Sequence, residues 1–310
     1  MLYFIVNEKS KSGNAKQIWK EIEEVLKVRN VSYQAFVSEY RGHAGKLATE
    51  ICAMDDNDIC LVAVGGDGTA NEVINGITDF EKVCFGVIPT GSGNDLARGL
   101  SLSKDPKNGV IHILNAMKKS REDTWCMDLG EVSLGEKKRL FAISAGIGLD
   151  ALVCKKALKS TIKDILNKIR LGKLTYLVLT VQSLFTMQTA DAEIFFDREE
   201  GLQKKRMIFT AAMNFKAEGG GVPMAPAASA CDGKLSFCEA AGIPKWRTFL
   251  CLPFLVAAKH TSIHGFSVTD AKDCTIRLSR PMVVHADGEY CGEVTEVHFH
   301  CLPGKLRVLK

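Results

Sequence analysis

Short apolar runs alternate with helical stretches from Leu2 to Met117. The apolar runs are Leu2–Val6, Tyr33–Val37, Ile59–Val64 and Val83–Ile88, and the helical stretches are Ala15–Val28, Ala44–Met54, Ala70–Ile77, a segment from Leu96 onward and Gly109–Met117. Strands and helices in alternation imply right-handed β-α-β crossovers and a mostly parallel sheet with helices on both faces. Apart from Gln34, the runs are continuously apolar, as expected of parallel strands covered on both sides. We therefore predict an N-terminal α/β domain.

The pattern changes after residue 124, where strand candidates follow one another with few helices between them. They are Cys126–Val132, Arg139–Ser144, Ala192–Phe196, Arg206–Met213, Lys234–Ala240, Phe266–Thr269, Cys274–Leu278, Met282–His285, Glu296–Cys301 and Leu306–Leu309. Two helical stretches, Ala151–Met187 and Lys245–Lys259, interrupt this series. Short strands joined by turns predict an antiparallel sandwich or barrel. We place the domains at residues 1–124 and 125–302, and we expect residues 303–310 to pack back on the first.

The composition limits the classes of protein to which this chain can belong. Its 310 residues include 40 basic and 36 acidic side chains, and the net charge of +4 is too small for a dedicated nucleic-acid-binding protein. The longest apolar stretches, Leu174–Met187 and Phe249–Ala258, fall short of the roughly 18 residues that a membrane-spanning helix needs. The 11 cysteines are odd in number and include no Cys-x-x-Cys pair. This usage indicates reduced thiols in a cytoplasmic protein.

The most specific motif is Gly65-Gly-Asp-Gly-Thr69, which lies between an apolar strand and a helix. Glycines allow backbone N–H groups to approach a phosphate closely, and the N-terminus of the next helix favours an anion. Asp67 would repel that phosphate unless it holds a metal ion or a proton network that bridges to it. The alternative is a glycine turn with an N-capping aspartate. No Gly-x4-Gly-Lys-[Ser/Thr] sequence is present, which excludes a P-loop NTPase.

Two further polar segments follow strands of the same predicted sheet. Pro89-Thr-Gly-Ser-Gly-Asn-Asp95-Leu-Ala-Arg98 follows the strand Val83–Ile88, and Asn7-Glu-Lys-Ser10-Lys-Ser-Gly13 follows the first strand. The carboxyl ends of parallel strands meet at one edge of a sheet, where open α/β folds bind ligands. The sequence therefore predicts a nucleotide site with three polar walls at this edge. The histidine pairs His260/His264 and His298/His300 lack a partner at zinc-like spacing, so we interpret them as core or solvated residues.

Later motifs complete a recognisable set. They are Asp128-Leu-Gly130, Ser144-Ala-Gly-Ile-Gly-Leu-Asp150, Gly219-Gly-Gly-x-Pro-x-Ala-Pro226, Asp232-Gly-Lys-Leu235 and Asp287-Gly-Glu289. With the two loops above, the sequence resembles the diacylglycerol kinase catalytic-domain family, which comprises soluble bacterial lipid kinases related to sphingosine kinases. The matches span residues 7–289. Gly-Gly-Asp-Gly-Thr alone is shared with NAD kinases and phosphofructokinases, whereas the combination is specific.

The resemblance implies an α/β nucleotide domain like that of NAD kinases and phosphofructokinases, followed by a β-rich lipid-binding domain of sandwich or barrel type. It implies an ATP site lined by Asn7, Glu8, Lys9, Ser10, Lys11, Ser38, Gly66, Asp67, Gly68, Thr69, Ala70, Asn71, Glu72, Ser92 and Glu289. The family's first loop usually reads Asn-Pro-x-Ser-Gly, but here Glu8 replaces the proline and Lys11 replaces the glycine. Lysine adopts a positive φ less readily than glycine, so these replacements bear on the contacts to adenine and ribose.

The resemblance further implies two cation sites and a catalytic base. The residues that would position the catalytic Mg²⁺ and the phosphates are Asp67, Ser92, Asp95 and Asp128. A structural cation would bind Asp232 together with the carbonyl groups of Ser229 and Lys234. Asp287 would be the general base that accepts the proton of the acceptor hydroxyl. The related sphingosine kinases leave Asp67 as a rival for that role.

The expected function is transfer of the γ-phosphate of ATP to a primary hydroxyl of a lipid, with Mg²⁺ as cofactor and diacylglycerol as the first candidate acceptor. Undecaprenol, phosphatidylglycerol and a sphingoid base are rival acceptors, because acyl-chain pockets carry no short sequence code. The sequence also leaves open an NAD kinase-like enzyme and a catalytically silent lipid-binding protein. Homodimers occur in the family, so a homodimer is a further expectation.

Basic residues are concentrated in one segment of the chain. Residues 151–187 carry seven basic side chains against one acid, Asp164. A basic amphipathic helical region of this kind favours an anionic membrane surface, where each Lys or Arg contributes about 1 kcal/mol. The alternative is a solvated helix face over the protein's own core. We expect a cytoplasmic protein that associates peripherally with the inner face of the membrane through this segment.

Overall fold

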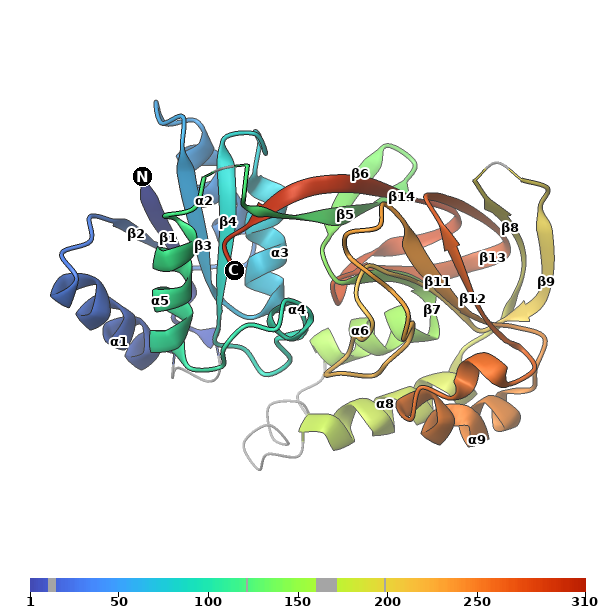
Figure 1. Cartoon of the computed structure of the whole chain (residues 1–310). Coiled ribbons are helices and arrows are strands. Elements are labelled where there is room, and N and C mark those ends of the chain that lie inside the picture. Colours follow the sequence, from blue (N-terminus) through green and yellow to red (C-terminus); the bar gives the residue numbers. More distant parts are fainter. Residues whose placement is uncertain (11–14, 121, 160–171, 198) are drawn as a thin grey trace. The chain divides into compact units, whose positions relative to one another are not determined.

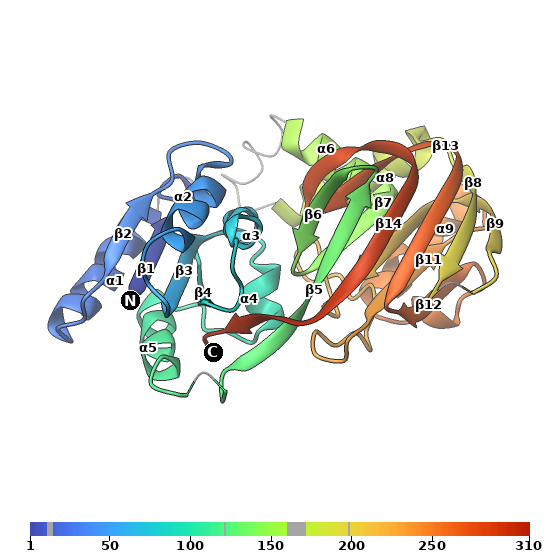
Figure 2. The same cartoon turned by 90° about the horizontal axis from the view of Figure 1, so that it is seen from above.

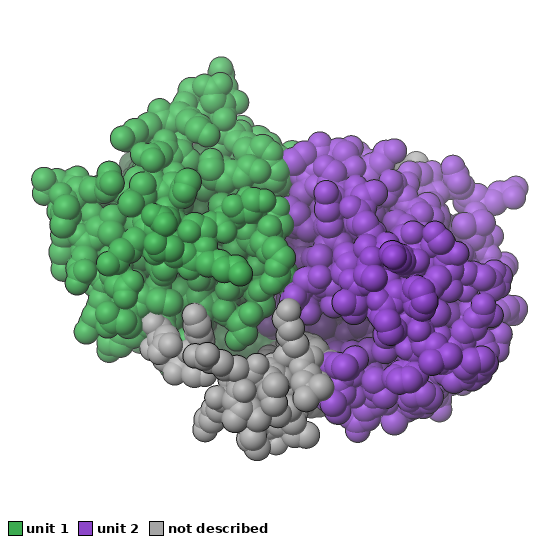
Figure 3. Space-filling model, turned by 60° about the horizontal axis from the view of Figure 1, so that its bottom comes forward, with its two compact units in different colours: residues 1–129, 303–310 green, residues 130–302 purple. Residues whose placement is uncertain are grey.

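The computed structural model describes residues 1–10, 15–120, 122–159, 172–197 and 199–310 (Figure 1). The chain divides into two compact units, which are Met1–Leu129 with Pro303–Lys310 and Gly130–Leu302 (Figure 3). The chain passes between them within strands β5 (Trp125–Leu134) and β14 (Glu289–Val308). The predicted boundary after residue 124 differs from the observed division after Leu129, because β5 continues without interruption from one unit into the other.

The first unit contains a parallel sheet in the order β2-β1-β3-β4, to which the end of β14 adds a further parallel strand beside β4. Its strands are β1 (Leu2–Val6), β2 (Gln34–Val37), β3 (Ile59–Gly65) and β4 (Val83–Pro89). Its helices are α1 (Ala15–Val28), α2 (His43–Cys52), α3 (Asp67–Gly76), α4 (Asp95–Gly99) and α5 (Pro106–Ala116). The predicted parallel α/β architecture is confirmed.

The core of the first unit follows from the spacing of apolar residues on its helices. Helix α1 buries Trp19, Ile22 and Leu26, which recur along one helix face. This face packs with α5 against apolar residues of β1 and β3, including Phe4 and Val62. Helices α2 and α3 pack against each other so closely that a Cβ atom on Gly76 would lie 2.1 Å from the backbone oxygen of Gly45.

The second unit is mainly antiparallel, with the central strand order β12-β11-β10-β7-β13-β14. Figure 2 shows β13 between β14 and β8. Strand β8 pairs with β13, β9 pairs with β8, and β6 pairs with β5. Its strands other than β14 are β6 (Lys137–Phe141), β7 (Ser144–Gly148), β8 (Ala190–Phe196), β9 (Leu202–Met207), β10 (Phe209–Met213), β11 (Leu235–Ala240), β12 (Phe266–Ala271) and β13 (Asp273–Ala286). The prediction of a β-rich second part is confirmed.

Helices α6 (Leu149–Lys159), α8 (Gly172–Thr186) and α9 (Lys245–Val256) accompany this sheet, with a short 3₁₀ turn, η2 (His260–Ser262). Helix α6 packs on β7, β10 and β13, α8 packs against α6, and α9 packs against α8. The predicted helical stretch 151–187 corresponds to α6 and α8, and residues 160–171 within it lie outside the described residues. None of the helices in the described ranges is long and apolar enough to cross a membrane.

Two differences from the predicted strands have physical causes. Residues 144–148 form β7, a fully buried central strand, although their small residues and glycines lack the usual strand pattern. Gly146 is needed there, because a Cβ atom would lie 1.8 Å from Asp150 Oδ2. The two strands predicted on either side of Pro281 are one strand, β13, whose pairing with β14 shifts between Arg277 and Met282. An irregularity of this kind accommodates a proline that cannot donate a hydrogen bond.

Candidate active site

The carboxyl ends of three neighbouring strands in the first unit are joined by backbone hydrogen bonds. The N–H of Asn7 donates to the oxygen of Val64 at 2.9 Å, and the N–H of Thr90 donates to the oxygen of Gly65 at 2.8 Å. The segments that follow β1, β3 and β4 therefore lie at one edge of the sheet. The structure thus brings together the described residues of the three polar segments that the sequence placed at strand ends.

The two glycine loops touch through their backbones. A Cβ atom on Gly91 would lie 2.7 Å from the Cα atom of Gly66, closer than any side chain tolerates. A Cβ atom on Gly65 would meet the side chain of Thr69 at 2.5 Å. Close packing within the loops therefore requires glycine at these two positions.

Asp67 links the two loops. Its Oδ2 atom accepts a hydrogen bond from the backbone N–H of Asp95 at 3.0 Å, and its Oδ1 atom accepts one from Leu96 at 3.1 Å. The sequence predicted a helix from Ala70, but α3 begins at Asp67 because Gly66 is extended and its oxygen accepts from the N–H of Ala70. A carboxylate in the first turn is favoured by the positive end of the helix dipole.

The loop after β4 is organised by its own polar side chains. The Asn94 side chain bonds both backbone groups of Gly91, and Asn94 itself adopts a positive φ of 53°. Asp95 is buried and forms an ion pair with Arg98, whose guanidinium also donates to the oxygen of Gly93. A Cβ atom on Gly93 would lie 3.1 Å from Asp67 Oδ2 and 3.7 Å from Asp95 Oδ2. The carboxylates of Asp67 and Asp95 therefore flank the same glycine.

Hydroxyl and amide groups from the other loops gather at this edge. The Asn7 amide donates to Thr69 Oγ1 at 3.0 Å, and the Ser10 hydroxyl bonds the hydroxyl of Thr90. Sequence reasoning assigned Asn7, Ser10 and Thr69 to the nucleotide site but missed Thr90. The available signal was a hydroxyl residue between the end of β4 and Gly91. Ser92 is exposed at the loop surface.

The remaining predicted nucleotide residues differ in their surroundings. Ser38 is buried, and its N–H donates to the oxygen of Val6 at 2.8 Å. Lys9 donates from Nζ to the oxygen of Glu39, and Glu72 accepts from the N–H of Gly42 at 2.8 Å. The carboxylate of Glu8 lies 4.0 Å from Lys16 Nζ. Lys11 lies outside the described residues, so its prediction stays open.

The other predicted nucleotide residues lie along the start of α3. They are Gly66, Gly68, Ala70 and Asn71. The first two are partly exposed, and the last two are buried. They therefore place backbone groups near the N-terminus of the helix, where an anion is favoured.

Asp128 lies on β5 and is 2% exposed. Its Oδ1 atom accepts a hydrogen bond from the N–H of Gly304 at 2.7 Å, which holds the returning C-terminal segment. Within the described part of the chain, Asp128 does not form a cluster with Asp67 and Asp95 whose oxygens lie within 4.8 Å of one another. A shared role of the three carboxylates toward one Mg²⁺ therefore stays a prediction.

In the second unit, Asp287 occupies the tight turn between β13 and β14. Asp287 and Gly288 both have positive φ, 48° and 82°, and Ala286 pairs with Glu289 across the turn. The Asp287 carboxylate accepts hydrogen bonds from the backbone N–H groups of Ala142 and Ile143 at 2.8 Å and of Ser144 at 3.1 Å. The carboxylate is therefore held in one orientation. Glu289 is the first residue of β14 and is partly exposed.

A polar cluster around the buried His285, which sequence reasoning missed, lies beside this turn. His285 Nε2 lies 3.1 Å from Asp150 Oδ2, and His285 Nδ1 accepts from the N–H of Gly288 at 3.2 Å. Burial lowers the pKa of His285, but the hydrogen bond and charge of Asp150 and the charges of Glu218 and Asp287 together raise it above its usual value. Asp150, Glu218 and His285 offer atoms within 4.8 Å of one another, a set that could hold a cation.

The predicted structural cation site lies on an exposed turn before β11. Asp232 Oδ1 accepts from the backbone N–H of Lys234 at 3.1 Å, and Ser229 is exposed nearby in sequence. One carboxylate and two backbone carbonyl groups are oxygen ligands of the type that Ca²⁺ and Mg²⁺ prefer. The donor chemistry of this turn therefore fits the predicted ion.

The interpretation of His298 and His300 needs a correction. Asp273 lies across the β13–β14 pair, where its carboxylate is 2.7 Å from His300 Nδ1 and 3.4 Å from His298 Nε2. The sequence showed no carboxylate partner because Asp273 is distant along the chain. His260, in contrast, is fully buried and donates from Nε2 to the oxygen of Met224, as a core histidine.

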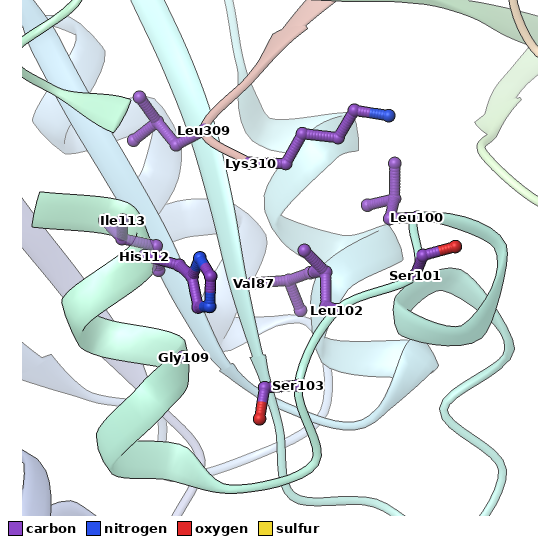
Figure 4. A pocket seen from close by; sticks show the side chains of 10 residues that line it. All are labelled: Val87, Leu100, Ser101, Leu102, Ser103, Gly109, His112, Ile113, Leu309 and Lys310. Atoms are coloured by element: carbon purple, nitrogen blue, oxygen red, sulfur yellow. The ribbon is translucent and has the colours of Figure 1, made fainter. Parts of the chain in front are cut away.

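A hollow of about 310 Å³ lies in the first unit, away from these groups (Figure 4). It is lined by Val87, Leu100, Ser101, Leu102, Ser103, Gly109, His112, Ile113, Leu309 and Lys310. None of the predicted nucleotide, metal or catalytic residues contributes to it. The hollow is therefore distinct from the glycine loops.

A parallel α/β unit with paired glycine loops is followed by an antiparallel β unit, and two family models match these parts of the chain. The model of the diacylglycerol kinase catalytic domain matches residues 1–132, and the model of the YegS C-terminal NAD kinase beta sandwich-like domain matches residues 144–310. The chain belongs to the diacylglycerol kinase catalytic-domain family, as its motifs predicted.

Individual relatives extend over most of the chain. A Bacillus subtilis (strain 168) protein named as a candidate lipid kinase, YtlR, is 29% identical over 311 residues, covering 99% of this chain and 98% of the relative. The diacylglycerol kinase of the same organism is 27% identical over 256 residues, covering 81% of this chain and 76% of the relative.

Solved structures share the fold. A candidate diacylglycerol kinase from Bacillus anthracis has a TM-score of 0.77 at 20% identity, covering 99% of this chain and 96% of the other. An NAD kinase from Archaeoglobus fulgidus in complex with ATP has a TM-score of 0.55 at 14% identity, covering 100% of this chain and 94% of the other. These likenesses confirm the predicted fold class.

Proposed function

We propose that this protein is an ATP- and Mg²⁺-dependent lipid kinase that transfers the γ-phosphate to a primary hydroxyl, with diacylglycerol as the first acceptor to test. The family and the names of its relatives support a lipid kinase. The single observation that carries the proposal is the junction of the two glycine loops through Asp67. This junction presents backbone groups and a helix N-terminus at one sheet edge, an arrangement suited to a chain of phosphates.

The residues present fit a bound Mg²⁺. Asp67 and Asp95 flank Gly93 and offer carboxylate oxygens, which are the ligands that Mg²⁺ prefers together with water and substrate phosphates. When bound, the ion neutralises charge on the phosphoryl group. The backbone N–H bonds to Asp67 fix its carboxylate before any ligand arrives. Asp128 is assigned to the same network as a proposal.

Asp287 is proposed as the general base, and Glu289 as a nucleotide contact. Phosphoryl transfer needs a carboxylate held in a defined position to accept the proton of the attacking hydroxyl. The three N–H bonds to Asp287 supply that orientation. Asp67 remains the rival candidate for the general base. Substitution of each of the two residues distinguishes between these assignments.

The experiment that tests the function uses labelled ATP, Mg²⁺ and mixed detergent micelles that contain one lipid at a time. Diacylglycerol, undecaprenol, phosphatidylglycerol and a sphingoid base are compared, and NAD is the control acceptor. Label in phosphatidic acid supports the proposal, and label in another lipid changes only the acceptor. Label that appears in NADP alone contradicts the lipid kinase proposal, and absence of label in every product supports a silent lipid-binding protein.

A further inference from the structure

Helix α9 is apolar on the side that faces away from the protein. Its buried side consists of Thr248, Cys251 and Leu255. The exposed side chains are Trp246 (60% exposed), Phe249 (40%), Leu250 (56%), Phe254 (49%) and Val256 (65%). A surface helix normally carries polar residues on its outer side, and a helix that is apolar all round is normally covered. The outer side of α9 is therefore unlike a solvated helix face.

Helix α8 continues this surface. Leu177, Val178 and Phe185 are each about half exposed on it. The rings of Phe185 and Phe249 lie 6.1 Å apart, and Lys245 Nζ donates to the backbone oxygen of Phe185 at 3.4 Å. Figure 1 shows α8 and α9 side by side on one side of the second unit. We call the eight exposed side chains of the two helices the apolar face. Exposed apolar side chains gathered on two neighbouring helices mark an interaction site.

The two helices that carry the apolar face contain basic residues and no acidic ones. The sequence contains no Asp or Glu from Ala240 to Thr269, and none from Gly172 to Ala190. Arg247 and Lys259 are exposed at or near α9. Two neighbouring helices that expose apolar side chains and carry basic but no acidic residues are complementary to a bilayer with anionic headgroups.

Two lysines of α6, at the start of the basic segment 151–187, contact other residues of the second unit. Lys155 forms an ion pair with Glu293, which raises the pKa of Lys155, and its Nζ atom lies 5.0 Å from the ring centre of Tyr290. Lys156 Nζ donates to Thr186 Oγ1 at 3.2 Å. Both lysines therefore bind other side chains of the second unit. The sequence placed the membrane contact on the segment 151–187, which includes α6 and α8. Within its described residues, we assign the contact to α8, together with α9.

We propose that the apolar face docks on the surface of an anionic lipid bilayer, with Trp246, Leu250 and Phe254 inserted among the lipids and Arg247 at the phosphate headgroups. The proposal rests on the proposed function, since a kinase for a membrane lipid must act at a bilayer. Tryptophan is enriched at the boundary of lipid and water, where its ring is partly apolar and its N–H finds a partner. The alternative occupant is a second copy of the chain.

The first test is sedimentation of the whole chain with vesicles, in the absence of ATP. Binding is expected to vesicles of phosphatidylcholine mixed with phosphatidylserine, and to weaken with pure phosphatidylcholine or with added salt. Leu250→Gln and Phe254→Gln are each expected to lower binding at least about tenfold. Leu202→Gln is the matched control, because Leu202 is 48% exposed but lies on β9; it is expected to bind as the wild type does.

The second test follows the fluorescence of Trp246. A shift to shorter wavelength is expected on addition of the mixed vesicles, and Trp246→Phe is expected to abolish it. Equal vesicle binding by the wild type and Leu250→Gln overturns the proposal. Light scattering that shows a dimer dissociated by Leu250→Gln, together with unchanged vesicle binding, also overturns it and assigns the face to a second copy of the chain.

The outcomes separate this proposal from the proposed function. If vesicle binding depends on Leu250 but no lipid is phosphorylated, the docking stands and the kinase proposal fails. If the wild type and Leu250→Gln phosphorylate lipid in vesicles equally and bind them equally, the kinase proposal stands and the docking fails. If both hold, Leu250→Gln loses activity on vesicles but keeps it on a short-chain diacylglycerol dissolved in water.

Discussion

The Oδ1 atom of Asp67 lies 3.1 Å from the backbone nitrogen of Leu96 and accepts its hydrogen bond. The other oxygen of the same carboxylate accepts from the neighbouring N–H of Asp95 at 3.0 Å. One side chain thus anchors the first turn of α4 to the first turn of α3. Because hydrogen bonds to a charged group are strong, this contact sets the distance between the two loops that are proposed to hold the phosphates.

Replacing Asp67 with asparagine is expected to loosen this junction. An amide offers one oxygen, and its NH₂ group would face an N–H donor, so one buried bond is lost. We expect the free energy of unfolding to fall by about 1–3 kcal/mol and the turnover to fall about 100-fold. Urea denaturation and labelled-phosphate transfer measure the two effects.

Asp105→Asn is the matched control for that substitution. Asp105 also accepts from a backbone N–H, that of Lys107 at 3.0 Å, as the N-cap of α5. Asparagine is equally good at this position, so stability and turnover are expected to stay near the wild-type values. Wild-type turnover in Asp67→Asn would show that the junction has no role in catalysis.

Asp287→Asn is expected to lower turnover by about 10²- to 10⁴-fold, the usual contribution of a general base, while ATP binding is kept. The matched control is Asp197→Asn. Asp197 also has a positive φ, 45°, and accepts from the backbone N–H groups of Lys272 and Asp273 at 2.9 and 2.8 Å. Both variants are expected to lose stability, but only Asp287→Asn is expected to lose turnover.

The comparison with Asp67→Asn decides between the two candidate bases. Near-normal turnover in Asp287→Asn, with turnover abolished and ATP binding intact in Asp67→Asn, assigns the base to Asp67. Calorimetric titration with ATP measures binding in each variant, and phosphate transfer measures turnover.

Two glycine substitutions are expected to act in opposite directions. Gly91→Ala places a Cβ atom 2.7 Å from the Cα atom of Gly66, which forces the loops apart and is expected to weaken ATP binding and lower stability. Gly109→Ala lies within α5, where its Cβ atom would make ordinary contact with Ile88 at 3.8 Å. It is expected to raise the free energy of unfolding by about 0.5–1 kcal/mol without changing ATP binding. Equal melting temperatures for both variants would refute this account.

The buried pair of His285 and Asp150 predicts a dependence of stability on pH. The folded pKa of His285 is raised above its usual value of 6.5 by Asp150 and the nearby acids, despite burial. The folded state therefore binds the proton more tightly, so the stabilisation is complete below the unfolded pKa and is lost as the pH rises through the folded pKa. Protonation of Nδ1 removes the acceptor for the N–H of Gly288, which offsets part of this stabilisation.

Asp150→Asn tests this dependence. The pKa of His285, read from the NMR shift of its Cε1 proton, is expected to lie above 6.5 in the wild type and lower in the variant. The loss of stability in the variant is expected to be largest at acidic pH and to shrink as the pH rises. A loss that is constant with pH would show that His285 does not titrate with Asp150.

Local sequence determined much of this protein. The alternation of apolar runs and helical stretches was enough to predict the parallel sheet, since strand and helix periodicity are local properties. The glycine loops at the ends of β3 and β4 marked the candidate nucleotide site for the same reason. The family followed from the order of these motifs with Asp128 and Asp287.

Only the tertiary structure decided which side chains meet. Asp287 bonds the N–H groups of residues 142–144, and His285 meets Asp150, across more than 130 positions of the chain in each case. No local pattern encodes such partners, because they depend on how β7, β13 and α6 pack. The sequence likewise did not predict which side of α9 is exposed. A helix with apolar residues all round has no amphipathic pattern to orient it, so packing against α8 decided which side faces outward.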